Sequence, residues 1–208
     1  MQPEVALREV AQAVSVCTRC ALHFSRKRSV PGEGPADAQV MLIGEGPGFH
    51  ENEQGRPFVG QAGKFLDELL ALAGLKRTEV FITNVVKCRP PGNRDLPEEL
   101  SACSAMLEQQ LEIIHPRVIV TLGRFSMARF LPNARISEIH GQPRWVDDGC
   151  MIVPMYHPAA ALHQPKLRPD LEADFARLPG YLQMQPGPQK PSVPPKKGTE
   201  AETQLSLF

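Results

Sequence analysis

Short, unbroken runs of apolar residues alternate along this chain with segments of helical periodicity. The apolar runs predict buried strands at residues 40–43, 80–82, 118–122 and 151–154. Apolar residues spaced along one helix face predict helices over residues 5–16, 63–73 and 97–114, and Gly123 opens a further helix. Continuous apolar strands separated by helices are typical of a parallel sheet covered on both faces. The pattern therefore predicts an α/β fold, a single three-layer domain with a central four-stranded parallel sheet flanked by helices.

The chain divides by composition into three parts. Residues 1–182 carry the periodic segments and are expected to form one domain. Residues 183–203 contain five prolines, scattered charge and no apolar periodicity, which predicts a flexible linker. Residues 204–208, Gln-Leu-Ser-Leu-Phe, are apolar again and form a short terminal peptide.

Polar residues follow three of the predicted strands at the point where each strand ends. These are Glu45, Asn84 and His157. The carboxyl ends of parallel strands meet at one edge of a sheet, and ligands bind there. One polar residue at a strand end is unremarkable, but three of them beside the glycine-rich turn 44–48 predict an active site.

Four of the five cysteines are spaced like metal ligands. Cys17 and Cys20 form a C-x2-C pair, and Cys88 and Cys103 follow with fourteen residues between them. The N-terminus lacks the basic start and apolar centre of a signal peptide, so a reducing, cytoplasmic setting is expected, where such cysteines favour metal over disulfides. Four thiolates suit either zinc or an iron–sulfur cluster. The fifth, Cys150, precedes an apolar strand and is interpreted as a small buried apolar residue.

The charges balance, with 23 basic and 23 acidic residues, so bulk charge predicts no polyanionic partner. A local basic strip, Arg19 to Val30, contains four cations and no acid. It is either a phosphate-contacting surface, centred on residues 26–28, or a solvated loop. No apolar run approaches the length of a membrane span, and no membrane partner is expected.

Four segments, taken in order, resemble the iron–sulfur (family 4) uracil-DNA glycosylases: residues 44–48, 55–63, 83–90 and 157–160. The resemblance covers about residues 14–180. It implies a monomeric, nucleoid-associated DNA repair enzyme that flips uracil out of single- or double-stranded DNA and hydrolyses the N-glycosidic bond, leaving an abasic site. It also implies that the four cysteines hold a [4Fe-4S] cluster, with zinc as the alternative.

The resemblance further implies roles for single residues of the pocket. Phe58 would stack on the flipped base, and the Asn84 amide would pair with O4 and N3–H of uracil. His157 would donate to O2 as negative charge builds on the leaving base. Glu45 would stabilise the sugar cation or position the water. Gly44 and Gly46 are expected to border the substrate.

Other residues are implied to act around the pocket. Glu51 aligns with a position that crowds the 5-methyl group of thymine, although the following Asn52 stands where the family commonly has an aspartate. Arg89 and Arg94 are expected to contact phosphates. Leu162 is the expected wedge that fills the gap left by the flipped base.

The terminal peptide Gln204–Phe208 is identical to a form of the motif by which bacterial repair proteins bind the β sliding clamp. This predicts a bacterial source and a clamp partner.

Two alternative functions stay open. One is a covalent trap for abasic DNA, disfavoured because residues 91–97 contain no histidine. The other is a cluster-bearing adaptor without activity, from which release of free uracil would distinguish an enzyme.

Overall fold

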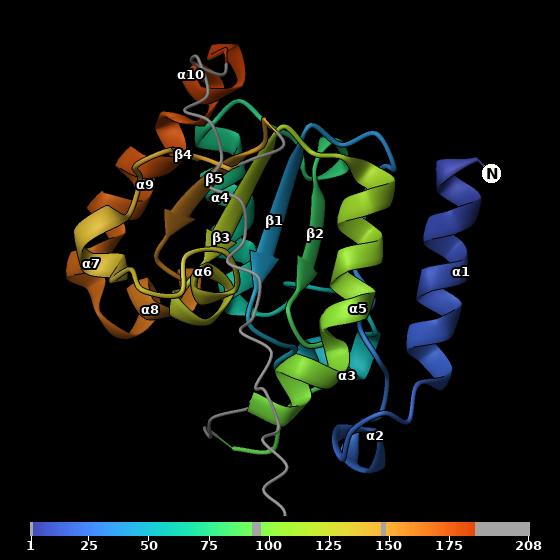
Figure 1. Ribbon diagram of the computed structural model, residues 1–208. Coiled ribbons are helices and arrows are strands. Elements are labelled where there is room, and N and C mark those ends of the chain that lie inside the picture. The colour runs from blue at the N-terminus through green and yellow to red at the C-terminus, as the bar shows by residue number, and fades with distance from the viewer. Residues whose placement is uncertain (1, 93–96, 147–148, 186–208) are drawn as a thin grey trace, which may run out of the picture.

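A mostly parallel sheet lies at the centre of the protein (Figure 1). A computed structural model describes residues 2–92, 97–146 and 149–185. The strand order is β2-β1-β3-β5-β4. The strands are β1 (Val40–Gly44), β2 (Phe81–Asn84), β3 (Val118–Leu122), β4 (Arg144–Trp145) and β5 (Met151–Met155).

The predicted α/β architecture is confirmed, with one addition at the sheet edge. The four predicted strands are β1, β2, β3 and β5, and they pair in parallel. The sequence analysis did not predict β4, which pairs antiparallel with β5. Its two residues are exposed, so the strand is too short and too polar to produce an apolar run.

Helices connect the strands and begin close to the predicted positions. They are α1 (Pro3–Val16), α2 (Leu22–Ser25), α3 (Phe49–Gln54), α4 (Gln61–Leu72), α5 (Pro97–Ile114), α6 (Arg124–Phe130), α7 (Ile136–Ile139), α8 (Pro158–His163), α9 (Arg168–Ala176) and α10 (Leu178–Gln183), with 3₁₀ turns η1 (Arg77–Glu79) and η2 (Pro165–Leu167). Helix α5 starts at Pro97, where the missing N–H costs no hydrogen bond.

Alternate residues of each buried strand feed two different apolar cores. Leu42, for example, joins the core formed with α4 and α9, whereas Met41 joins the core formed with α5. Side chains alternate across a strand, so each face of the sheet needs its own helical cover. The result is the predicted three-layer arrangement, with both sheet faces buried.

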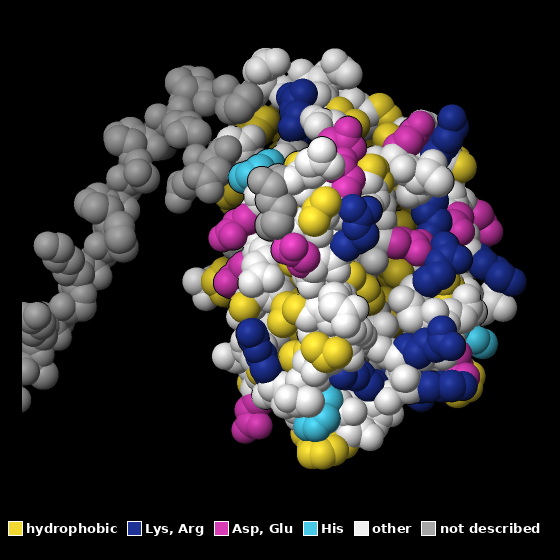
Figure 2. All heavy atoms as spheres, turned by 90° about the vertical axis from the view of Figure 1, so that its right-hand side faces the viewer, with side chains coloured by type: hydrophobic (Ala, Val, Ile, Leu, Met, Phe, Trp, Pro, Cys, Tyr) yellow, Lys and Arg dark blue, Asp and Glu magenta, His cyan; other side chains and the backbone are white. Residues whose placement is uncertain are grey.

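Helix α1 lies outside these layers and packs along α5 (Figure 1). A small third core joins Val10 and Val14 of α1 to Met106 of α5. On the face that carries α1, basic and acidic side chains are interspersed (Figure 2). This face therefore presents no broad surface of a single charge, in keeping with the balanced composition.

None of the helices in the described ranges is both long and apolar enough to cross a membrane. The last described helix, α10, ends at Gln183, close to the expected end of the domain. Most of the proposed linker and the whole peptide 204–208 lie outside the described residues, so both stay predictions.

Candidate active site and cysteine cavity

A cavity of about 480 Å³ opens at the carboxyl ends of the parallel strands. This size is in the ordinary range for small-molecule sites. Its lining includes Glu45 and Gly46 after β1, Arg89 after β2, and His157 with Ala160 after β5. A cavity therefore lies at the carboxyl ends of the strands, where the sequence predicted an active site.

Asn84 is the last residue of β2 and is paired in register with Gly44 of β1, the residue before the cavity-lining Glu45. Asn84 itself is not among the residues that line the cavity. Its side chain is buried, and its Oδ1 accepts no hydrogen bond from any group in the described part of the chain. Buried polar atoms are normally paired. An unpaired buried acceptor is therefore ready for a donor supplied by a ligand.

Gly44 makes this arrangement possible. A Cβ atom at Gly44 would lie 2.4 Å from Oδ1 of Asn84 and 2.7 Å from Cζ of Phe58. Both distances are below any normal contact, so only glycine admits the two side chains. Gly44 thus brings the end of β1, the Asn84 amide and the Phe58 ring together, as the sequence analysis expected for these three residues.

His157 follows β5 and caps helix α8, where its Nδ1 accepts a hydrogen bond from the backbone N–H of Ala159 at 3.1 Å. In a neutral imidazole with Nδ1 as acceptor, the proton lies on Nε2. Burial lowers the pKa of His157 to about 4, against a smaller opposing effect of Glu51. The ring is therefore neutral near pH 7 and offers a single N–H donor.

The Phe58 ring stacks on the His157 ring, with centroids 5.5 Å apart and planes 26° apart. Phe58 is buried and adopts a positive φ of 50°, which is uncommon for a residue with a side chain. Such backbone strain persists only where neighbouring groups enforce it.

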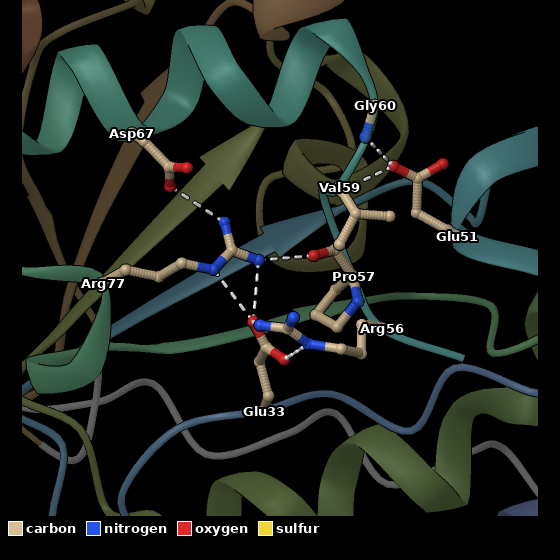
Figure 3. A network of polar contacts seen from close by, with 8 residues as sticks. All are labelled: Glu33, Glu51, Arg56, Pro57, Val59, Gly60, Asp67 and Arg77. Atoms are coloured by element: carbon tan, nitrogen blue, oxygen red, sulfur yellow. Dashed lines mark hydrogen bonds and ion pairs between the residues drawn. The ribbon is translucent and has the colours of Figure 1, made fainter. Parts of the chain in front are cut away.

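Ion pairs and hydrogen bonds on both sides of Phe58 enforce that conformation (Figure 3). On one side, the Arg77 guanidinium donates to the carbonyl of Pro57 and to the carboxylates of Glu33 and Asp67. Arg56 also donates to Glu33, at 2.7 Å. Burial alone would raise the pKa of Glu33, but the hydrogen bonds from Arg56 and Arg77 hold it below its ordinary value.

On the other side, Glu51 accepts hydrogen bonds from the backbone N–H groups of Val59 and Gly60, at 2.8 and 3.0 Å (Figure 3). Glu51, which lies on helix α3, therefore attaches the loop that contains Phe58 to that helix. Its expected role in excluding the 5-methyl group of thymine stays a prediction.

Glu45 is half-buried at the cavity wall. Burial raises the pKa of its carboxyl group, and Arg124 acts in the opposite direction. A carboxylate in this position could stabilise a positive charge or orient a water molecule.

Of the residues expected to contact DNA, Arg89 lines the cavity. Arg89 is exposed and its guanidinium lies 5.4 Å from the centroid of the exposed Phe49 ring. Leu162 on α8 is 45% exposed, and its role as a wedge stays a prediction. Arg94 lies outside the described residues.

Two cations of the basic strip make contacts within the protein. Arg26 donates to the Cys88 sulfur at 3.3 Å and to the backbone of Ser15 at 2.8 Å, and Lys27 pairs with Glu53. The half-buried Arg26 therefore lies at the cysteine site, and the phosphate contacts expected of residues 26–28 stay a prediction.

All four predicted ligand cysteines line one shared cavity. Cys17 and Cys20 enter it from the segment after α1, Cys88 from the loop after β2, and Cys103 from α5. Within the described ranges, no three metal-ligating side chains are arranged around a single point that would hold one ion. The four cysteines therefore share one cavity, but they do not form a ready-made site for a single ion. Cys150 is half-buried against the β-sheet core, close to its interpretation as an apolar residue.

Three residues of this region were missed by sequence reasoning: Glu33, Arg77 and Lys87. Glu33 and Arg77 act across 44 positions of sequence, and nothing in their neighbours marks the pairing. Lys87 stands between Val86 and Cys88, where a buried lysine in an apolar stretch is itself an unusual signal.

Comparisons with known proteins agree with this geometry. The family model described as "Uracil DNA glycosylase superfamily" matches residues 31–178. The chain is similar to proteins named type-4 uracil-DNA glycosylase from three organisms. It is 44% identical to that of Sulfurisphaera tokodaii, over 83% of each chain, and 44% identical to that of Archaeoglobus fulgidus, over 83% of this chain and 92% of the relative. It is also 44% identical to that of Thermotoga maritima, over 76% and 84%.

Proposed function

Because this chain belongs to the uracil DNA glycosylase superfamily, we propose that the cavity at the ends of β1, β2 and β5 is the site where it excises uracil from DNA. The reaction is hydrolysis: the bond between the sugar C1′ and uracil N1 breaks, water adds to C1′, and uracil leaves with an abasic site behind it. The target nucleotide must leave the stack to reach the cavity, so the enzyme flips it out of the DNA.

The observation that carries the proposal is the unpaired, buried Oδ1 of Asn84. Uracil offers the matching donor at N3–H and an acceptor for the Asn84 amide at O4. Cytosine has no proton on N3 and an amino group in place of O4. Cytosine would leave both groups of the buried amide without partners, which is a strong basis for rejection.

The other pocket residues then supply the steps of the cleavage. The Phe58 ring offers a stacking surface for the base. The neutral His157, with its proton on Nε2, donates to uracil O2 and stabilises the negative charge of the leaving base. Glu45 stabilises the positive sugar and positions the attacking water, helped by the desolvated setting of its carboxylate.

Uracil release by the intact protein tests this assignment. On a uracil-containing single-stranded oligonucleotide we expect turnover in the wild type and a loss of about 100-fold or more in Asn84→Asp and His157→Ala. A protein–DNA adduct that survives hot detergent would support the covalent-trap alternative instead. No release from a correctly folded, metal-loaded protein would support the adaptor alternative.

We also propose that Cys17, Cys20, Cys88 and Cys103 hold a [4Fe-4S] cluster. Four cysteine thiolates bind such a cluster by one sulfur to each iron, so the sulfurs surround a space. A zinc ion instead requires four ligands around one point. The cavity that all four cysteines line supports a shared metal centre, and the resemblance to the iron–sulfur (family 4) uracil-DNA glycosylases favours the cluster over zinc. When bound, the cluster supplies a covalent tie between α1, the loop after β2, and α5. Metal analysis for iron, sulfide and zinc separates the alternatives.

The surroundings of the pocket support a DNA-binding surface. Arg89 and Arg94 are proposed phosphate contacts, and Leu162 the wedge that enters the duplex behind the flipped base. The strand-end residues of the proposed site all come from one chain, which supports a monomer. The proposed action on DNA supports a nucleoid-associated location.

The peptide Gln204–Phe208 is proposed to bind the bacterial β sliding clamp, with Leu207 and Phe208 in an apolar pocket and Gln204 at its rim. A flexible linker of about 20 residues would place it roughly 25 Å from the domain. A clamp pull-down tests the proposal. Retention of clamp by a protein truncated at residue 203, equal to that of the full chain, would contradict it, and with it the inferred bacterial source.

A further inference from the structure

Lys87 is a buried lysine placed between the uracil pocket and the cysteine cavity. Lys87 is 1% exposed, and it lines the cavity that the four cysteines share. Its side chain nevertheless turns away from that cavity, toward the end of β2. There Nζ lies 2.6 Å from Thr83 Oγ1, 2.8 Å from the Asn84 carbonyl oxygen and 2.7 Å from Gln110 Oε1.

The partners of Nζ define its hydrogen-bonding state. The Thr83 hydroxyl donates to the Pro31 carbonyl at 2.9 Å, so toward Lys87 it acts as an acceptor. The Gln110 amide nitrogen donates to the same carbonyl at 2.7 Å, which leaves Oε1 facing Lys87. All three partners are therefore acceptors. Only an ammonium group, with three N–H bonds, satisfies them together.

One ammonium group thus joins residues 83–84 at the end of β2 to Gln110 of α5. The Lys87 backbone N–H also donates to the Cys103 sulfur, and Cys88 is the next residue. Lys87 therefore contacts the cysteine site through its backbone and the end of β2 through its side chain.

We propose that Lys87 is a positioning residue that couples the cysteine site to uracil recognition. Its ammonium group, required by the three acceptors, holds the backbone of Asn84 at the end of β2, and its backbone N–H holds the Cys103 sulfur. Thr83 and Gln110 complete the support from β2 and α5. The inference rests on the proposed uracil site and cluster, and it adds a reason why the cluster ligand Cys88 lies four residues after Asn84.

The test uses the full chain with its metal site loaded and compares wild type, Lys87→Met and Thr121→Val. Thr121 is a buried residue of β3 whose hydroxyl has no partner in the described ranges, so Thr121→Val is a matched loss of a buried polar group. Iron content and absorbance establish loading. Single-turnover excision, affinity for uracil-free single-stranded DNA and the midpoint potential of the cluster are then measured.

In Lys87→Met we expect excision to slow about 10- to 100-fold, the scale typical of residues that orient a primary ligand. Affinity for uracil-free DNA is expected to match the wild type. The midpoint potential is expected to shift to a more negative value, because loss of a nearby positive charge disfavours addition of an electron. Thr121→Val should change neither the excision rate nor the midpoint potential. A purely structural role for Lys87 would leave the potential unmoved.

Lys87→Met with the wild-type rate, or with the wild-type potential, would overturn the inference. If that variant does not load, Thr83→Val gives the same test through a nearly isosteric change, since it removes one of the three acceptors. Slower excision with unchanged loading is expected, and an unchanged rate would overturn the inference. A wild type that releases no uracil would instead contradict the proposed function itself.

Discussion

Gly44 shows how closely a single residue determines the pocket. The space at its Cα is taken by Oδ1 of Asn84 and the ring of Phe58, which a methyl group would meet at 2.4 and 2.7 Å. We expect Gly44→Ala to fold, since β1 remains paired on both sides, but to displace these groups by a substantial fraction of an ångström. A misplacement of about 1 Å at a reacting site can cost about 100-fold in rate. Single-turnover uracil excision measures the loss.

Gly180→Ala is the matched control, because a Cβ atom at Gly180 meets nothing within 4 Å. It should excise uracil at the wild-type rate. A Gly44→Ala enzyme as active as this control would mean that Asn84 and Phe58 are not held in the productive positions that the structure places beside Gly44.

The half-buried imidazole of His157 gives a prediction about pH. Its pKa of about 4 in the folded protein is well below the ordinary value of about 6.5. A histidine with a lowered pKa takes up its proton more readily when the chain is unfolded. His157 therefore has no effect on stability above about pH 6.5, and it increasingly destabilises the fold as the pH falls from there toward 4.

NMR titration of ¹³C-labelled histidine checks this value directly. The His157 signal, assigned by its absence from His157→Ala, should remain that of a neutral ring at pH 6 and titrate near pH 4. A midpoint near 6.5 would mean that the ring is more solvated than the structure indicates. It would also mean that a substantial fraction of His157 is charged under mildly acidic assay conditions.

At this scale the sequence predicted residue types better than their surroundings. Glu45, Asn84 and His157 were placed at one sheet edge because parallel strands must end together. Phe58 and Glu51 came from the family resemblance instead. The hydrogen bonds of Arg77 with Glu33, and of Lys87 with Gln110, were not predictable because they join residues distant in sequence. The Lys87 bonds to residues 83 and 84 are local, but they depend on a side-chain direction that no sequence pattern encodes.

The loop from Arg56 to Gly60 is the element on which the stacking surface depends. Arg77 connects it to Glu33 and Asp67, and all of these groups retain some contact with water. We expect Arg77→Met to lower the free energy of unfolding by about 1–3 kcal/mol, toward the lower end because the network is partly exposed. Excision should also slow as Phe58 relaxes from its positive φ. Chemical denaturation and single-turnover kinetics measure the two effects.

The pH dependence of this loss has a defined sign. Glu33 has a lowered pKa, so its contribution to stability is present above the ordinary glutamate pKa of about 4.3 and is lost as the pH falls through the folded value. The difference between wild type and Arg77→Met should therefore shrink in acid. Arg135→Met, which removes a cation that is 81% exposed and lies outside the loop, should leave stability almost unchanged.

Among the elements, those with continuous apolar runs were predicted with near-correct bounds, because burial on both faces leaves a strong signal. Helix α5 begins at the predicted Pro97. The strand β4 and the helices α2, α3, α7, α8, α9 and α10 were not predicted. All of these except α9 have six residues or fewer, so their conformation is decided by capping and tertiary contacts instead of periodicity. Helix α9 has nine residues, but they include few apolar side chains and therefore give no clear helical pattern.

For the molecule as a whole, the cysteine cavity lies between helix α1, which has a small apolar core, and the central part of the fold, where the sheet is buried on both faces. Helix α1 has a small core of its own, Val10 and Val14 against Met106, whereas the sheet is buried on both faces. A helix held by so few apolar contacts should open locally at lower cost than the central strands. The metal centre proposed at the four cysteines would supply the missing restraint between α1 and α5.

Removal of the metal should therefore loosen helices α1 and α2 and leave the central sheet intact. After oxidation and chelation, or in Cys20→Ala, we expect amide hydrogen exchange to quicken across α1 and α2, while β1 and β3 stay protected. Cys150→Ala is the matched control, since Cys150 is not among the residues that line the cavity, and it should retain both the metal and the protection of α1. Equal protection of α1 with and without metal would mean that the contacts with α5 suffice. The centre would then act chiefly on the loop after β2, where Cys88 leads through Lys87 to the pocket.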